Sequence, residues 1–413
     1  MVNGVSNKTR RSVAIASLAV LFLLIGALVV TKFVPIGAKS AGPPPSISPT
    51  TSLNTGTSST TVQAPSTAEF NVVSYGADPT GIKDSTTAIQ QAIAAAEAQP
   101  GSEVYFPAGK FVLSKPSTKL FDFVINKPIH IVGAGIDATT IVNKIGQKTP
   151  GVSVSTDIFV IEVTHGLQTG GASGSSISNM TLDSQTYDAG TDIMDFANNT
   201  TLSNLKVLAA TSTNSYNYNS FGIRVIAICN PSDVSRIYRV NNVLNNITII
   251  GNGLQGTTEL DLSCQVNTTA TNINIQGNGV DIFYCHNDSI TNANLIGGTN
   301  GSTNYYTWVI TGSSYIALTN INATGIGGVI APDIQIVSHN ISIVNETMTL
   351  PSAFLYIGDS KDTTIGQSSL GEIAINPKFT VTGLTLTQTT HGIVKCRPGA
   401  VITGLSGLVC TAA

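Results

Sequence analysis

A short pattern of apolar and polar positions recurs along residues 177–405, in the order apolar, any residue, Asn, apolar, any residue, apolar. Its central residue is Asn179, Asn204, Asn246, Asn272, Asn292, Asn320 and Asn340, and then Gly383 and Gly404. Most copies follow one another after similar short intervals, and two intervals are twice as long, which suggests a coil whose pattern has been lost. A repeat of this kind, on the order of 20 to 30 residues, indicates a solenoid rather than a compact globule.

The same pattern predicts what each repeat is made of. Side chains alternate between the two faces of a strand, so apolar positions two before and one after the Asn cannot face the same way on one straight strand. The chain must therefore turn at the Asn, which tolerates the left-handed backbone conformation of such a corner, as Gly does even better. We predict an all-β parallel β-helix of roughly a dozen coils, with the Asn amides stacked above one another.

One segment has helical rather than strand periodicity. Residues 85–98 place an apolar stripe on one face, after Asp84 as an N-cap and before Pro100 and Gly101. The stripe consists of Ala88, Ile89, Ala92, Ile93 and Ala96. Because the open end of a solenoid needs a cover, we expect this helix to cap the first coil.

The segments around this helix carry a family resemblance. The sequences Tyr-Gly-Ala-Asp-Pro-Thr-Gly at 75–81, Asp-Ser-Thr-Thr-Ala-Ile-Gln at 84–90 and Val-Tyr-Phe-Pro-Ala-Gly at 104–109 resemble the start of the pectate-lyase superfamily domain, which includes rhamnogalacturonase and epimerase-like proteins. The resemblance extends over about residues 69–410. It implies that residues 69–413 form a right-handed parallel β-helix that acts on or binds polysaccharide, but it implies no single chemistry.

The N-terminal residues predict export. Residues 1–12 carry basic side chains, and residues 13–30 contain no charge, extending to 34 if Lys32 reaches the interface. This length is sufficient for one transmembrane signal-anchor over 13–34, with a cytoplasmic N-terminus and the body outside the cell. A cleaved signal peptide, which would release a secreted protein, is the alternative. Residues 35–68 are rich in Pro, Ser and Thr and predict a disordered linker.

The charge of the chain narrows its partners. The whole chain carries −3 and residues 1–40 carry +5, which leaves −8 for the remainder. A weakly acidic surface argues against nucleic acid as a partner. It also disfavours a polyanionic substrate, unless a cation mediates.

The five cysteines do not form the pattern of a disulfide-rich scaffold or of a zinc site. Cys264 and Cys285 are separated by the length of one coil, so they could stack closely enough to form a disulfide, or both could remain free thiols. Among many Asn-x-Ser/Thr sequences, Asn300 in a Gly-rich stretch is the best candidate for a glycosylated loop position.

The best candidate for chemistry emerges when the coils are aligned on their Asn corners. Asp281 and Asp261 each lie eleven residues before an Asn corner and are flanked by apolar residues that should face inward. Both Asp side chains should therefore point outward on neighbouring strands, about 4.8 Å apart. Asp192 falls in about the same column, separated from them by a coil in which Arg224 or Ala227 takes the corresponding place.

Two carboxyl groups so close cannot both ionise cheaply, so one pKa should rise. A protonated acid beside a charged carboxylate is what glycoside hydrolysis requires, so Asp261 and Asp281 are the predicted catalytic residues. The same pair could instead bind Ca²⁺, in a calcium-dependent lyase or a structural site. Both could also be solvent-facing strand residues without chemistry.

Further residues near the pair complete the predicted site. Glu259 precedes Asp261 on the same face and could be a third carboxylate, and His286 lies at a turn near Asp281 and could assist as an acid or base. Aromatic side chains suit sugar rings, although the same residues could fill the interior. The candidate substrate-binding aromatics are Phe283, Tyr305, Tyr306 and Trp308.

The catalytic signatures of the best-known relatives are absent. The chain has no Asn-Thr-Asp, Asp-Asp, Gly-His-Gly or Arg-Ile-Lys set, as in polygalacturonases, and no Arg-x-Pro-x-x-Arg, as in pectate lyases. The sequence therefore predicts a membrane-anchored extracellular polysaccharide-active protein, with a glycoside hydrolase favoured. A non-catalytic surface protein that binds glycan or is structural in the cell envelope, and a calcium-dependent lyase, remain alternatives. The sugar and the oligomeric state are left open.

Overall fold

The computed structural model describes most of the chain between Thr67 and Ala412. The described ranges are 67–114, 121–144, 157–162, 171–184, 191–209, 221–227, 229, 237–251, 258–297, 307–325, 328–331, 338–348, 354–358, 360–370 and shorter pieces beyond. The expected anchor at 13–34, nearly all of the linker, Asn300, Tyr305, Tyr306, Gly383 and Gly404 lie outside these residues. Among the residues that are described, no helix has the length and apolar character needed to cross a membrane. They all belong to the second of two contact units, residues 63–413.

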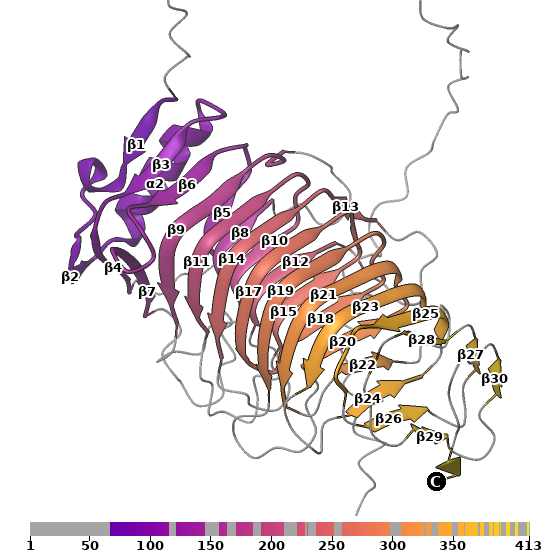
Figure 1. Ribbon diagram of the computed structural model, residues 1–413. Helices are drawn as coiled ribbons and strands as arrows, with labels where there is room; N and C mark the ends of the chain where they lie inside the picture. The colour runs from indigo at the N-terminus through magenta and orange to yellow at the C-terminus, as the bar shows by residue number, and fades with distance from the viewer. Residues whose placement is uncertain are drawn as a thin grey trace, which may run out of the picture. The chain divides into compact units, whose positions relative to one another are not determined.

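A twelve-stranded parallel sheet runs the length of this unit and receives one strand from each coil (Figure 1). Its strands are β5 (Phe121–Ile125), β8 (Asp157–Ile161), β10 (Thr191–Asp195), β12 (Phe221–Ile226), β15 (Thr258–Ser263), β18 (Val280–Phe283), β20 (Trp308–Thr311), β22 (Gly328–Ala331), β24 (Phe354–Ile357), β26 (Glu372–Ile375), β29 (Val394–Cys396) and β31 (Thr411–Ala412). Twelve strands in this sheet agree with the predicted dozen coils. Nearly all parallel crossovers are right-handed, and the right-handed winding that the resemblance implies stays a prediction here.

A second parallel sheet contains the Asn corners, and a two-stranded sheet of β13 (Arg239–Val240) and β16 (Gln265–Val266) lies between neighbouring coils. The strands of the second sheet are β1 (Glu69–Asn71), β2 (Thr80–Asp84), β3 (Glu103–Phe106), β4 (Gly109–Leu113), β6 (His130–Gly133), β7 (Thr139–Asn143), β9 (Ser176–Asp183), β11 (Thr201–Leu208), β14 (Val243–Ile250), β17 (Thr269–Gly277), β19 (Ser289–Gly297), β21 (Ser314–Thr324), β23 (Ser338–Met348), β25 (Ser360–Gly366), β27 (Thr380–Thr382), β28 (Thr385–Thr387) and β30 (Val401–Thr403). Each corner Asn from Asn179 to Asn345 lies inside a long strand rather than between two short ones.

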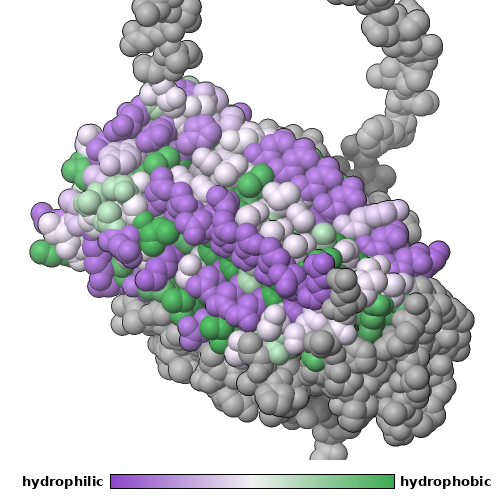
Figure 2. Space-filling view, in the orientation of Figure 1, coloured by the Kyte–Doolittle hydropathy of each residue, from purple (hydrophilic) through white to green (hydrophobic). Residues whose placement is uncertain are grey.

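The predicted corners from Asn179 to Asn320 and their amide stack are confirmed. Asn246, for example, has φ of 55° and donates to Asn204, which donates to Asn179, over 2.9 and 3.0 Å. The stack continues from Asn272 through three further coils, as each Asn donates its amide to the preceding one. Hydrophilic side chains accordingly form bands across this face (Figure 2).

Two details of the predicted repeat are wrong. The corner after Asn320 is Asn345 and not Asn340, because Asn345 donates to Asn320 over 2.8 Å and the strands align on that register. The long interval from Asn204 to Asn246 hides no coil, since β11 pairs directly with β14. The other long interval does hide one, because a corner at Gln367, with φ of 50°, follows Asn345.

The predicted capping helix is confirmed as α2 (Thr86–Glu97). All five residues of its apolar stripe are buried. Asp84 accepts hydrogen bonds from the backbone N–H and the hydroxyl of Thr86, at 3.4 and 2.6 Å, and from the backbone of Ser114 at 2.8 Å. Asp84 therefore links the start of the helix to Ser114, the residue that follows β4. The N-cap position itself is taken by Ser85.

The core is a continuous stack of inward aliphatic side chains. Leu205, Ile247 and Ile273 occupy equivalent inward positions in successive coils, and each is at most 1% exposed. Since each coil buries its apolar residues only against its neighbours, the stack holds together by many equal contacts. The outward positions are thereby left free to differ from coil to coil.

Candidate active site

Three charged residues follow one another in a single column of the twelve-stranded sheet. The strand registers align Arg224 of β12 with Asp261 of β15, and Asp261 with Asp281 of β18. The column continues with Met194 on one side and Val309 on the other. The predicted pairing of Asp261 with Asp281 is therefore confirmed, but Asp261 is buried, only 4% exposed, and does not face the solvent as predicted. Arg224 is the residue in the preceding coil.

Arg224 and Asp261 contact each other directly, whereas Asp281 is held by a separate donor. Arg224 donates from Nε to Asp261 Oδ2 over 3.0 Å, and its guanidinium lies over the ring of Phe221, 4.0 Å from the centroid. Ser263 donates its hydroxyl to the other oxygen of Asp261 over 2.5 Å. Thr258 donates its hydroxyl to Asp281 Oδ2 over 2.8 Å. Asp261 is thus held by a cation, whereas Asp281 is held by a neutral donor.

This difference sets the proton affinity of Asp281. The pKa of Asp281 is raised from 3.8 to about 7, chiefly by desolvation and next by the negative charge of Asp261, while the Thr258 hydrogen bond and Arg224 oppose the rise. The Asp281 carboxyl therefore holds its proton up to about neutral pH, beside a carboxylate that is ion-paired with Arg224. Such a pair can deliver a proton and stabilise a positive charge on the same bound molecule.

The comparisons with known proteins agree with this architecture. The model of the family "rhamnogalacturonase A/epimerase, pectate lyase-like" matches residues 69–304, more than half of the chain. The chain belongs to this family. The resemblance predicted from residues 75–109 is therefore confirmed.

Curated relatives match only a small part of the chain. Mannuronan C5-epimerases AlgE1 and AlgE2 of Azotobacter vinelandii are each 43% identical over 76 residues, which is 18% of this chain and 5% and 7% of theirs. Among solved structures, the A-module of mannuronan C-5 epimerase AlgE4 from the same organism has a TM-score of 0.42 at 14% identity, over 83% of this chain and 99% of that chain. The catalytic domain of a GH87 α-1,3-glucanase has a TM-score of 0.49 at 13% identity, over 83% of this chain and 70% of that chain.

Two further carboxyl groups of this family member, those of Glu259 and Asp192, lie outside the column of Arg224, Asp261 and Asp281. Glu259 is only 2% exposed, although the sequence predicts it on the same outer face as Asp261. Its carboxylate accepts from the backbone N–H of Asn278, and a Cβ atom on Gly251 or Gly277 would come within 2.0 Å of it. Glu259 therefore fills a niche that these glycines leave open, and its position is structural.

Asp192 also departs from its predicted place. It is buried, and the register of β10 with β12 aligns Met194, not Asp192, with Arg224. Its carboxylate accepts a hydrogen bond from the hydroxyl of Ser184. Asp192 therefore belongs to the interior of the coil and not to the charged column.

The predicted aromatic residues are likewise divided between the outer face and the core. Phe283 lies on the outer side of β18, half-buried, two residues after Asp281. Trp308 is in the core instead, 1% exposed, where it takes the inward position equivalent to Val280. Its indole donates to the buried carboxylate of Glu346 over 2.9 Å, and Gly328 in the next coil makes room for the ring. The expectation that Trp308 lines an outer site is therefore corrected.

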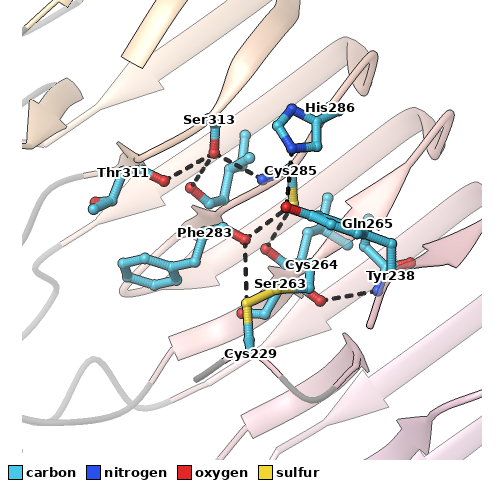
Figure 3. The surroundings of a disulfide bond; sticks show 12 residues. Cys229, Tyr238, Ser263, Cys264, Gln265, Phe283, Cys285, His286, Thr311 and Ser313 are labelled. Carbon is cyan, nitrogen blue, oxygen red and sulfur yellow. Dashed lines mark hydrogen bonds between the residues drawn. A yellow bond between two sulfur atoms is a disulfide. The ribbon is translucent and has the colours of Figure 1, made fainter. Parts of the chain in front are cut away.

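His286 belongs to a separate group of side chains around the next corner of the coil (Figure 3). Its Nε2 lies 3.1 Å from the hydroxyl of Tyr238, and its Nδ1 lies 2.5 Å from the hydroxyl of Ser314. These contacts tie His286 to the corner and involve neither Asp281 nor Asp261.

The same region corrects the predicted cysteine pairing. Cys264 forms a disulfide with Cys229, and Cys285 is a buried free thiol (Figure 3). One coil here extends from Asp261 to Asp281, so the position one coil before Cys285 is that of Gln265 and not that of Cys264. A shift of one position along a strand turns a side chain to the opposite face.

Sequence reasoning considered Arg224 only as a possible occupant of the column, and not as part of the site. A signal was present, because Ile223 and Val225 flank Arg224 just as Leu260 and Leu262 flank Asp261. This signal was hidden because the interval from Arg224 to Asp261 is much longer than the interval from Asp261 to Asp281. Within the described ranges, no group of three or more His, Cys, Asp or Glu side chains could hold a metal ion.

Proposed function

We propose that this protein acts on a polysaccharide and that the column Arg224–Asp261–Asp281 is its catalytic centre. The observation that carries the proposal is the pairing of two carboxyl groups in register, of which only one is matched by a cation. Charged side chains in neighbouring buried or half-buried positions cost stability, and groups of this kind cluster at functional sites. The family membership supports the substrate class, as do the mannuronan epimerases that match part of the chain.

We favour glycoside hydrolysis as the chemistry. Asp281, protonated near neutral pH, would donate its proton to the glycosidic oxygen as the bond to the sugar breaks. Asp261, ion-paired with Arg224, would stabilise the positive charge that develops on the sugar ring. Adjacent strands lie about 4.8 Å apart, which is nearer to the carboxyl separation of about 5–5.5 Å in retaining enzymes than to about 6.5–9.5 Å in inverting ones. We therefore propose retention, with Asp261 as the nucleophile.

Proton abstraction from a uronic acid is a second candidate. The 76 residues that are 43% identical to mannuronan C5-epimerases favour it. In this reaction Arg224 would neutralise the sugar carboxylate, while Asp261 or Asp281 would exchange the proton at C5. A calcium-dependent lyase belongs to the same chemistry. The remaining alternative is a non-catalytic glycan-binding or structural envelope protein, for which the column would be an ion pair without turnover.

The site of action belongs to the proposal as well. We infer that the β-helix lies outside the cell, attached through residues 13–34 or secreted. The Cys229–Cys264 disulfide supports export, because disulfides persist in oxidising compartments. If Cys229 and Cys264 of the chain isolated from its own cells without reductant both reacted with an alkylating reagent, export would be contradicted.

The substitution Asp281→Asn tests the catalytic centre. The full-length chain is incubated with mannuronan, polygalacturonate and α-1,3-glucan, and new reducing ends, ultraviolet-absorbing unsaturated products and C5 inversion by proton NMR are followed with and without EDTA. We expect the substitution to reduce turnover at least about 100-fold, because the amide keeps the shape of the side chain but cannot donate its proton in the same way. Asp137→Asn, at an exposed position near the capped end, is the matched control and should leave turnover unchanged.

The outcomes separate the candidates. New reducing ends without an unsaturated product support hydrolysis, an unsaturated product supports a lyase, and inversion at C5 without cleavage supports an epimerase. Turnover that survives Asp281→Asn in a folded protein would remove the proposed centre while keeping the enzyme. Binding without turnover on every substrate would favour the non-catalytic alternative.

A further inference from the structure

A second column of left-handed corners runs parallel to the Asn stack and contains one unexpected residue. Asn199, Asn241, Asn267 and Asn287 occupy it in successive coils and are joined by amide hydrogen bonds of 3.1, 3.2 and 3.4 Å. The next coil places Tyr315 in this position, with φ of 57°, and the following coil returns to Asn340. Tyr315 therefore interrupts a run of asparagines that extends from Asn199 to Asn340, and Asp362 takes this position in the coil after Asn340.

Stability gives no reason for this tyrosine. A bulky side chain is disfavoured in the left-handed region, where Asn is tolerated. Tyr315 cannot continue the amide stack in the way that Asn287 does. It also gains little burial in return, since 57% of the residue is exposed, and it is the only aromatic residue among the exposed large hydrophobic residues of the described ranges.

The surroundings of Tyr315 are those of a small binding surface. Its ring meets the imidazole of His339 edge to face, with centroids 5.5 Å apart and an interplanar angle of 81°. His339 Nδ1 lies 3.0 Å from the amide nitrogen of Asn340, and this contact orients the imidazole. An aromatic ring is thus held at the surface beside an oriented polar ring and exposed amides.

The neighbouring coil extends this surface. His286, Ser314 and His339 occupy one column in consecutive coils, so the small side chain of Ser314 lies between two imidazoles. The ring of Tyr238 lies tilted against the imidazole of His286, with centroids 5.1 Å apart and an interplanar angle of 53°. Two pairs of tyrosine and histidine therefore follow each other along the axis of the solenoid.

We propose that Tyr315 and His339, extended by Tyr238 and His286, form a carbohydrate-binding surface that holds a sugar ring of the polysaccharide. A pyranose buries its CH-rich face on an aromatic ring while its hydroxyl groups pair with polar side chains, and this surface offers both kinds of contact. The surface lies one corner beyond β18, in which Phe283 follows Asp281 along the chain and precedes the corner. It would therefore hold the polymer chain beside the proposed centre. The inference rests on the proposed polysaccharide substrate, but not on catalysis by Asp281.

The substitution Tyr315→Asn tests this surface. It introduces the residue that the neighbouring coils use, so the fold should be kept and the melting temperature should stay the same or rise. We expect the affinity for oligosaccharides of mannuronan, polygalacturonate or α-1,3-glucan, measured by isothermal titration calorimetry on the full-length chain, to fall about tenfold. Tyr315→Phe should keep most of the affinity, because the ring face remains. Val243→Ala, at an exposed position on another strand, is the matched control.

The results distinguish this inference from the proposed function. Unchanged affinity of Tyr315→Asn for a polysaccharide that the wild type binds would overturn the surface and leave the proposed function standing. Failure of the wild type to bind any of the three probes would overturn both. Loss of affinity in Tyr315→Asn, with Asp281→Asn still binding normally, would support a binding surface separate from the catalytic residues.

Discussion

The Asn-corner sheet and the twelve-stranded sheet wind through the same coils but use their outward columns differently. The corner column repeats one residue, from Asn179 to Asn345, and each member bonds to the preceding one except Asn272, which donates to Asn245. The column of the other sheet changes from Met194 through three charges to Val309. A column that repeats one residue stabilises the stack of coils. A short run of charged residues lowers stability instead, and it therefore marks a candidate functional site.

The disulfide offers the largest test of this contrast, because it joins two coils just beyond the ends of β12 and β15 in the twelve-stranded sheet. Cys229 and Cys264 close a loop over a sequence separation of 35 residues. Replacing both with Ser should lower the free energy of unfolding by about 4 kcal/mol on the loop-entropy model. Urea denaturation under non-reducing conditions measures the loss. Cys285→Ser, at the buried free thiol, is the comparison, and an equal loss in both variants would show that packing rather than the cross-link is responsible.

Glu346 provides an ionisable interruption in the apolar core behind the corner sheet. Burial raises its pKa from 4.5 to about 7, opposed by the hydrogen bond from Trp308. The folded protein therefore keeps a proton that the unfolded chain releases, so stability should fall as the pH rises from about 4.5 to about 7. The contribution of this one group is about 3 kcal/mol.

Glu346→Gln should remove that part of the pH dependence, since the amide can still accept from Trp308 but cannot ionise. Melting temperatures between pH 4 and pH 8 measure the slope. Other buried carboxyl groups, among them Asp195 and Asp288, have their pKa raised to about 7 by burial and should keep the remaining slope in the same direction. An unchanged slope would mean that Glu346 does not titrate in this range.

The regular column should give the smallest effect at any one position. Asn292 donates to Asn272 and accepts from Asn320, and it has φ of 57°. Asn292→Ala should cost about 2 kcal/mol, from two amide bonds and the left-handed backbone. Asn292→Gly should cost about 1 kcal/mol, because glycine keeps the backbone conformation. Equal losses in chemical denaturation would show that the amide stack, and not the corner, carries the cost.

The candidate site was predictable only where the coil length was regular. Asp261 and Asp281 are separated by one short, uninterrupted coil, so counting from the Asn corners aligned them correctly. Arg224 precedes Asp261 by 37 residues in an adjacent strand, and nothing in the sequence shows that this interval is also a single coil. Trp308 was misplaced because the room for its ring comes from Gly328, a residue of the next coil.

The sequence alone determined the repeat and its corners, because the left-handed preference of Asn and the alternation of side chains along a strand are local properties. It also determined the capping helix, whose stripe and N-terminal Asp84 lie within one short segment. Only the tertiary structure decided that Asn345 takes the corner, that Cys264 pairs with Cys229, and that Arg224 stands beside Asp261. Those outcomes depend on the register between coils, which the lengths of the intervening segments set, and a slip of one residue turns a side chain to the opposite face.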